Sequence, residues 1–272
     1  MPAQLNALLH AQWPLVPAVL IGAMTGAIFG SYIATLVLRW PQGKQASSGR
    51  SACDGCGRVL GALELVPIVS WMVQRGQCRH CGAQIDPIHL RTEAAAAVLG
   101  GAAMAHFPNA GGAAFALFIW QLLALAMLDA RHFWLPHRLS ALLAISGLAC
   151  GGVMMAAIGL PASLIDRLIG GVVGFGGLWL IGTAYARMRG RTGLGGGDAP
   201  MLGAIGLWTG WAALPFILLL ASLTGLAVAL FSRISPQDEQ SAVDWRHQRL
   251  PLGTLLAIAT PAALLVLRAM SA

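Results

Sequence analysis

Four of the five cysteines of this 272-residue chain form two closely spaced pairs. The pairs are Cys53-x-x-Cys56 and Cys78-x-x-Cys81, and 21 residues separate them. Two such turns, each followed by a glycine, can place four thiolates around one ion, and zinc favours a closed tetrahedral set of sulfur ligands. The spacing therefore predicts a structural zinc site, because a fully ligated ion has no open position for catalysis.

Other interpretations of these cysteines remain open. They could form two disulfides or act as independent thiols, although the predicted reducing, cytoplasmic location of the segment disfavours disulfides. His80, between Cys78 and Cys81, could compete as a ligand but is more typical of a solvated side chain. Cys150 stands alone in an apolar run and is typical of a small packing residue.

Two aspartates at the ends of apolar runs form a second candidate site. Asp129 ends one run and Asp198 begins another, after the glycine-rich segment 193–197. Acids at membrane depth are costly and often functional. If the two carboxylates meet, they share one proton, so that one activates water while the other polarises a peptide carbonyl. The pair predicts an aspartic peptidase, and Gly195 and Gly197 favour the close approach of a peptide backbone.

Each aspartate also has a structural interpretation. Asp198 is well placed to cap a helix N-terminus, with Pro200 tolerated in the first turn. Asp129 could pair with Arg131 or Arg138 at the surface, although an anion at the C-terminal end of a helix opposes the helix dipole. Serine and cysteine nucleophiles are disfavoured, because no serine lies in a G-x-S-x-G setting and a metal explains the paired cysteines.

The elements that position these residues are apolar runs typical of membrane-spanning helices. Hydrophobic residues make up 57% of the chain and charged residues 10%, against about 25% charged residues in soluble domains. A span needs roughly 20 apolar residues. Turns at 106–112 and 210–211 divide two runs that are too long for one span, so that eight spans result. The runs are 13–38, 94–128, 139–165, 168–186, 199–232 and 250–267.

This pattern predicts an all-α polytopic membrane protein with about eight transmembrane helices and a small zinc-binding tetracysteine insertion. Residues 1–38 form the first helix, 39–92 the zinc-binding loop domain and 93–272 a seven-helix peptidase core. No basic residue precedes the first apolar run, so that we expect this run to be a permanent helix rather than a cleaved signal peptide.

The basic residues indicate the orientation of the chain. With eight spans, all but Arg167 and Arg268 of the 17 lysines and arginines fall on one side. The positive-inside rule makes that side cytoplasmic and places both termini outside the cytoplasm. The net charge of +7 then reflects topology, and the sequence gives no reason to expect nucleic-acid binding. We expect membrane lipid to surround the protein.

Taken in order, these residues resemble the bacterial type IV prepilin leader peptidase family, which also processes pseudopilins of type II secretion. Gly30-Ser31, with Arg39 and Pro41, is similar to the family's opening G-S-F-x-N…R-x-P block. The tetracysteine segment encloses 64–71, which resembles E-L-x-P-x-x-S-W, and Glu93 matches a glutamate before the second span.

The second half of the resemblance lies in the membrane core. Asp129, followed by Leu135-Pro136, resembles the block of the family's first catalytic aspartate. The segment 195–198 matches G-x-G-D, which carries the second catalytic aspartate, and 250–253 resembles a closing P-F-G-P block. G-x-G-D alone is a weak signal, but its position after the tetracysteine loop is specific.

The resemblance implies a two-step activity at the cytoplasmic face of the bacterial inner membrane. The family cleaves a short basic leader after glycine, and many members then methylate the new N-terminus with S-adenosylmethionine. By this resemblance Asp129 and Asp198 form the peptidase pair and the cysteines bind zinc. Glu64 and Glu93 are the candidates for binding substrate or methyl donor, and no G-x-G-x-x-G unit provides a Rossmann-type site.

Several positions depart from the family pattern, while both aspartates are retained. The family's lysine two positions after the second aspartate is missing, which removes a positive charge from the rim of the site. The departures are Ala34 for Asn, His137 for Asp, Pro200 for Lys, Leu252 for Phe and Thr254 for Pro.

Three other functions remain as alternatives. A presenilin-like intramembrane protease shares G-x-G-D, but it leaves the tetracysteine loop unexplained. A small transporter would use Asp129 and Asp198 as ion or proton ligands deeper in the bilayer. An assembly factor would use the zinc loop to bind a pilus or secretion protein, and would tolerate replacement of both aspartates.

Overall fold

The computed structural model of the chain describes residues 11–46, 49–190, 193–234 and 250–271. The predicted polar loop 235–249, with Arg246 and Arg249, and the predicted loop residue Arg191 lie outside this part. The described residues are helical apart from loops and two isolated β-bridges. The α-helices are α2 (Leu15–Arg39), α3 (Val69–Val73), α4 (Ile88–His106), α5 (Ala110–His132), α6 (His137–Ala157), α7 (Leu164–Arg189), α8 (Asp198–Thr209), α9 (Leu214–Ile234) and α10 (Leu252–Ser271). Three short 3-10 helices are η1 (Trp40–Gln42), η2 (Ala62–Leu65) and η3 (Trp211–Ala213).

Each of the eight predicted apolar segments forms a helix, which confirms the all-helical membrane architecture. Within the described ranges, six segments are long and apolar enough to cross a membrane, and α4 and α8 are not among them. The 12 residues of α8 rise only about 18 Å, against roughly 30 Å of hydrocarbon. The number of eight crossings therefore stays a prediction.

The predicted fourth helix was too long at its C-terminal end. It was expected over 139–165, but α6 ends at Ala157 and α7 begins at Leu164. Gly159 adopts a left-handed φ of 80° and ends the helix there. The side chains of Ser163 and Asp166 then form a capping box that starts α7.

Contacts divide the chain into two compact units, Met1–Trp120 and Gln121–Ala272. In the first unit, α2 packs closely on α4 along a row of small residues. A Cβ at Gly30 would lie 2.6 Å from Cα of Glu93, and one at Gly26 would collide with the carbonyl oxygen of Ala96. The row therefore lets the two backbones approach, as small residues do between membrane helices.

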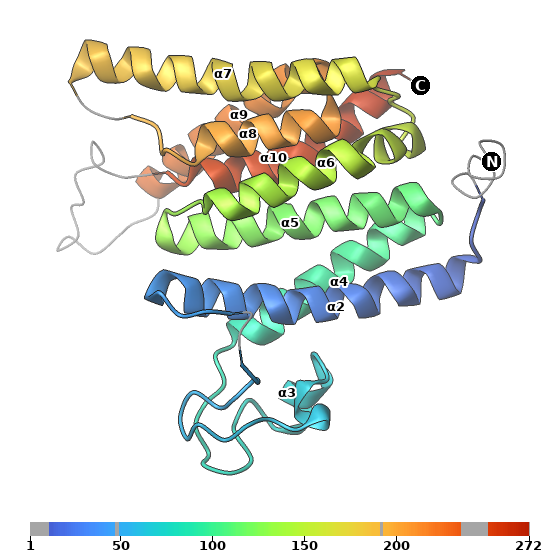
Figure 1. Cartoon of the computed structure of the whole chain (residues 1–272), viewed down its shortest axis with the longest axis vertical. Coiled ribbons are helices and arrows are strands. Elements are labelled where there is room, and N and C mark those ends of the chain that lie inside the picture. The colour runs from blue at the N-terminus through green and yellow to red at the C-terminus, as the bar shows by residue number, and fades with distance from the viewer. Residues whose placement is uncertain (1–10, 47–48, 191–192, 235–249, 272) are drawn as a thin grey trace. The chain divides into compact units, whose positions relative to one another are not determined.

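In the second unit, the short helix α8 is the buried centre. It lies between α6 and α7 (Figure 1), and its side chains are buried around the whole helix, as expected of a helix that is apolar on every face. The indole N–H of Trp208 donates to the carbonyl of Leu143 at 2.8 Å. Gly206 faces the backbone of Gly170 on α7 with no room for a side chain. This packing fixes the N-terminus of α8, where Asp198 lies.

Candidate active site and candidate metal centre

Each cysteine pair lies in a tight turn that an isolated β-bridge closes. The N–H of Gly57 donates to the carbonyl of Cys53 and that of Gly82 to the carbonyl of Cys78, both at 2.9 Å. Both glycines have a left-handed φ, 70° and 71°, which glycine adopts without strain. The glycine after each pair is thus what lets the turn close around its two sulfurs.

The two turns bring all four sulfurs together. The Sγ atoms of the four cysteines lie within 4.8 Å of one another, and those of Cys53 and Cys81 are 3.8 Å apart. A tetrahedron with metal–sulfur bonds of about 2.3 Å has sulfurs about 3.8 Å apart. All five cysteines are free, so that the disulfide alternative finds no support. His80 contributes no ligand atom to the cluster among the described residues.

Backbone dipoles favour the thiolate form of Cys78. The N–H groups of Cys81 and His80 point at the sulfur of Cys78 and lower the pKa of that thiol to about 6. At Cys81 the N–H of Ala83 acts in the same sense, but burial and the sulfurs of the other three cysteines raise the pKa of that thiol to about 11. A metal requires deprotonated sulfur ligands. The described donor set therefore fits a closed metal site with four thiolates.

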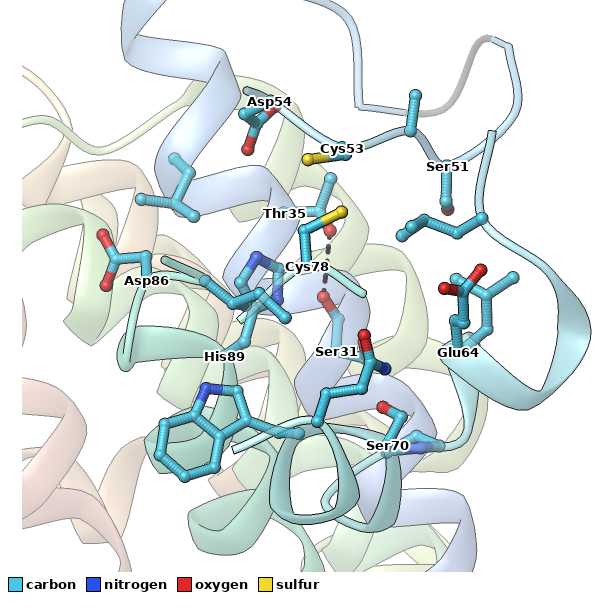
Figure 2. Close-up of a pocket in the computed structure, with 18 of the residues that line it drawn as sticks. Ser31, Thr35, Ser51, Cys53, Asp54, Glu64, Ser70, Cys78, Asp86 and His89 are labelled. Atoms are coloured by element: carbon cyan, nitrogen blue, oxygen red, sulfur yellow. Dashed lines mark hydrogen bonds between the residues drawn. The ribbon is translucent and has the colours of Figure 1, made fainter. Parts of the chain in front are cut away.

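Beside the cluster, the first unit contains a cavity of about 420 Å³. Figure 2 shows Ser31 and Thr35 of α2 on one wall, and Glu64, Cys78 and His89 around the same space. Burial lowers the pKa of His89, which keeps this imidazole neutral near pH 7. His89, the second residue of α4, was not predicted as a site residue, because no sequence motif surrounds it.

The two predicted glutamates line this cavity, and both also accept hydrogen bonds from the backbone of the tetracysteine insertion. Glu93 is 5% exposed, and its Oε2 accepts a hydrogen bond from the N–H of Ile68 at 2.7 Å. Glu64 accepts one from the N–H of Gly61 at 2.8 Å and lies 3.7 Å from the guanidinium of Arg58. The acids therefore shape the cavity as well as placing negative charge in it.

The two predicted aspartates lie in the second unit, near enough for the charge of one to act on the other. Asp129, near the C-terminus of α5, is 6% exposed, and Asp198, the first residue of α8, is 5% exposed. The charge of Asp129 acts on Asp198, so that the carboxylates are close enough to interact. The N–H of Gly195 donates to Oδ2 of Asp198 at 2.9 Å, and the N–H of Thr254 donates to Oδ2 of Asp129 at 2.8 Å.

Leu135 lies where the three segments of this site converge. A Cβ at Gly197 would lie 2.9 Å from the carbonyl oxygen of Leu135, and one at Gly253 would lie 2.7 Å from its side chain. A Cβ at Gly195 would lie 2.9 Å from the carboxylate of Asp198. The glycines predicted from G-x-G-D thus permit the close approach of the 193–197 loop to Leu135, between α5 and α6, and to its own aspartate.

The structural interpretations of the aspartates fit this geometry less well. Gly197, and not Asp198, is the N-cap of α8, and no side chain caps that end. Among the described residues Asp129 forms no ion pair with Arg131 or Arg138. The sequence argument missed the contact with Thr254, which it treated only as a departure from a family pattern. No local signal reveals this contact, because 125 residues separate its partners.

Comparisons with known proteins agree on one family of peptidases. Residues 24–107 match the model of the bacterial peptidase A24 N-terminal domain, and residues 116–230 match that of the type IV leader peptidase family. No solved structure matches the chain.

Curated relatives carry the same designation, "Prepilin leader peptidase/N-methyltransferase". The protein of Aeromonas hydrophila is 36% identical over 217 residues, which cover 79% of this chain and 71% of that protein. The protein of Pseudomonas aeruginosa is 34% identical over 230 residues, which cover 83% of this chain and 76% of that protein. The similarity thus extends over both described units.

Proposed function

Because the chain belongs to the type IV leader peptidase family, we propose that it is a membrane aspartic endopeptidase that removes the basic leader of prepilins or pseudopilins. The observation that carries this proposal is the proximity of two buried carboxylates, Asp129 and Asp198, in one helical unit. A buried acid pair is costly in a membrane protein and has a direct use in peptide hydrolysis.

The two carboxylates hold one proton between them, because adjacent acids do not both ionise easily. The ionised member removes a proton from water as the water oxygen bonds to the scissile carbonyl carbon. The protonated member gives its proton to the carbonyl oxygen, which yields a neutral gem-diol. The first acid then protonates the leaving nitrogen, the C–N bond breaks, and the second acid recovers its proton from the diol.

The topology of the substrate suits a pair at the membrane edge. A prepilin has a basic leader, a cleavage point and then a long apolar helix. Positive charges keep the leader in the cytoplasm while the helix enters the bilayer. With Asp129 and Asp198 at the cytoplasmic face of the bacterial inner membrane, the bond after the glycine reaches the pair without water entering the bilayer centre. Both termini of the chain then lie on the periplasmic side.

The tetracysteine cluster is proposed to hold a structural zinc ion. The separations of Cys53, Cys56, Cys78 and Cys81 match the size of a tetrahedral thiolate site. With four sulfur ligands the ion has no open position, so that its role is to hold the two turns of the insertion together. Metal analysis of the purified protein tests this point: one zinc per chain is expected, and none in a Cys53→Ser, Cys78→Ser double variant.

The cavity beside the cluster is proposed to bind S-adenosylmethionine, which supplies a methyl group to the new N-terminal amine. Its volume of about 420 Å³ falls in the range of small-molecule sites, roughly 300–1,000 Å³. Glu64 and Glu93 place negative charge on the wall, which suits a cationic methyl donor and a basic peptide. The neutral His89 offers a nitrogen that can accept a proton from an amine.

One experiment tests both activities. Purified protein in detergent is incubated with a prepilin that has a basic leader and glycine before phenylalanine, with and without S-adenosylmethionine, and products are followed by mass spectrometry. Wild type is expected to release the leader. Asp129→Asn and Asp198→Asn should each slow cleavage by roughly 10²–10⁴-fold. The matched control is Asp166→Asn, because Asp166 is an exposed capping acid and its variant should cleave normally.

The outcomes separate the alternatives. A methyl mass added to the cleaved product supports the second activity, and its absence in the presence of cleavage removes the methyltransferase part. Full cleavage by either Asn variant contradicts the paired-carboxylate mechanism. No cleavage by folded, metal-loaded wild type favours an assembly factor or a transporter.

A further inference from the structure

Helix α10 contributes hydrogen-bond donors to only one of the two aspartates. The backbone N–H of Thr254 donates to Oδ2 of Asp129 at 2.8 Å, and its hydroxyl lies 3.2 Å from the same oxygen. The N–H of Gly253 is also directed at this carboxylate. Among the residues that the structure describes, Asp198 receives one backbone donor, from Gly195. The two members of the pair are therefore not equivalent.

These donors belong to the first turn of α10. Gly253 and Thr254 are its second and third residues, and the N–H groups there have no acceptor within their own helix. The carboxylate of Asp129 takes the place of a capping side chain, supplied by α5. A helix N-terminus favours a negative charge, and hydrogen bonds donated to a carboxylate favour its ionised form. A backbone N–H cannot accept a hydrogen bond from the neutral acid.

The side-chain hydroxyl of Thr254 adds a further hydrogen-bond donor beside the backbone N–H groups of α10. Its single proton has two acceptors within reach, the carbonyl of Ala126 at 3.0 Å and Oδ2 of Asp129 at 3.2 Å. When Asp129 is ionised, the hydroxyl can turn to the carboxylate, and the bond becomes charge-assisted. Among the described residues, the charged group that interacts with Asp129 from another helix is Asp198 on α8.

We propose that Thr254 is a positioning residue that holds Asp129 as the ionised, water-activating member of the pair and leaves the shared proton on Asp198. This assignment rests on the proposed peptidase function, in which the roles of the two acids were interchangeable. It directs Asp129 to the attacking water and Asp198 to the carbonyl oxygen of the substrate.

The test compares wild type with Thr254→Val and Thr254→Ser. Valine keeps the shape and the backbone N–H but removes the hydroxyl, whereas serine keeps the hydroxyl. The matched control is Thr260→Val on the same helix, because the hydroxyl of Thr260 donates to the carbonyl of Leu256 within α10. Two quantities are measured against pH: leader cleavage, and the infrared carboxyl stretch that is lost in Asp129→Asn.

The direction of the expected pH shift follows from the loss of the Thr254 hydroxyl as a hydrogen-bond donor. Without the hydroxyl, ionisation of Asp129 requires a higher pH, so that the acidic limb of the kcat profile and the infrared midpoint move up by roughly half to one pH unit in Thr254→Val. At pH values below that limb, kcat falls about three- to tenfold, while KM stays unchanged. Thr254→Ser and Thr260→Val should follow wild type. At the pH of maximal activity, the protonated-carboxyl stretch of wild type should disappear in Asp198→Asn.

An unchanged infrared midpoint in folded Thr254→Val overturns the proposal, as does a protonated stretch at the pH of maximal activity that belongs to Asp129. Should the valine variant fail to fold, Thr254→Ala carries the same expectation. If wild type cleaves no prepilin but the infrared midpoint moves as expected, the peptidase function fails and the positioning role stands. If wild type cleaves and the midpoint does not move, the positioning role alone is wrong.

Discussion

Glu93 connects α4 to a strained point of the tetracysteine insertion. It accepts the N–H of Ile68, and Ile68 has a φ of 64°. A β-branched residue in this region is a true outlier, and such strain costs about 1–3 kcal/mol unless the surroundings hold it. The hydrogen bond from Ile68 to Glu93 is therefore what keeps the start of α3, and with it one wall of the cavity, in place.

We predict that Glu93→Ala lowers the free energy of unfolding by about 1–3 kcal/mol, because it leaves a partly buried N–H without an acceptor. Glu93→Gln keeps an acceptor oxygen and should lose less than half of that amount. Unfolding of the purified variants in detergent, followed by tryptophan fluorescence, measures the difference. Equal losses in the two variants would show that the charge of Glu93, and not its acceptor oxygen, carries the effect.

At the scale of single residues, the sequence allowed prediction of side chains whose type is unusual for their surroundings. Two acids at the ends of apolar runs and four paired cysteines stand out by composition and spacing, and the structure brings each set together. Leu135 and Thr254 are ordinary residues for a loop and a helix start. Their importance lies in contacts between distant segments, which no local pattern encodes.

At the scale of elements, the packing of α2 on α4 depends on the absence of side chains. We predict that Gly26→Ala destabilises the first unit by about 1–3 kcal/mol, because its Cβ collides with the backbone of α4 at Ala96. The control is Gly176→Ala in α7, where a Cβ meets nothing within 4 Å and the change should be neutral or slightly stabilising.

Thermal unfolding in detergent checks this pair of variants, with heat-induced loss of helical circular dichroism as the signal. The same thermal unfolding midpoint in Gly26→Ala and Gly176→Ala would contradict this prediction, because it would mean that α2 and α4 can move apart without loss of stability. Gly26→Ser should resemble Gly26→Ala, since the clash is at Cβ and not further along the side chain.

The helices themselves were largely predictable, because apolar runs of membrane length are the strongest signal that a sequence carries. The ends of the helices were harder to predict. The run 139–165 contains no charged residue, so that hydropathy does not reveal the break at Gly159 or the capping box at Ser163. Backbone conformation and a local hydrogen bond decide that boundary, and both are independent of hydropathy.

At the scale of the whole molecule, α4 and α8 decide how many times the chain crosses the bilayer. With eight crossings, the turn after α4 lies outside the cytoplasm. We predict that alkaline phosphatase fused after Asn109 is active and that green fluorescent protein at the same point is dark, because the phosphatase folds only outside the cytoplasm. Fusions after Gly159 and Gly190 are the controls and should report outside and inside, respectively.

A fluorescent fusion after Asn109 would show that α4 does not cross, and the sidedness of every later helix would then reverse. The sequence predicts this sidedness through the distribution of its basic residues. Hydropathy alone does not, because α4 and α8 fall below the length or apolarity of a typical span. For α8 the reason is physical: a helix surrounded by other helices needs neither the length nor the lipid-facing side chains of a span.

The hydrogen bond between Asp129 and Thr254 also has a consequence for the biogenesis of the enzyme. A ribosome that has just added Asp129 must add 125 further residues before the partner of Asp129 exists, which takes roughly 6–25 s at 5–20 residues per second. During this interval the nascent chain holds a membrane-edge carboxylate without its donors. On the proposed function, the proteolytic centre matures only when α10 docks, so that an unfinished chain does not yet cleave the newly inserted proteins around it.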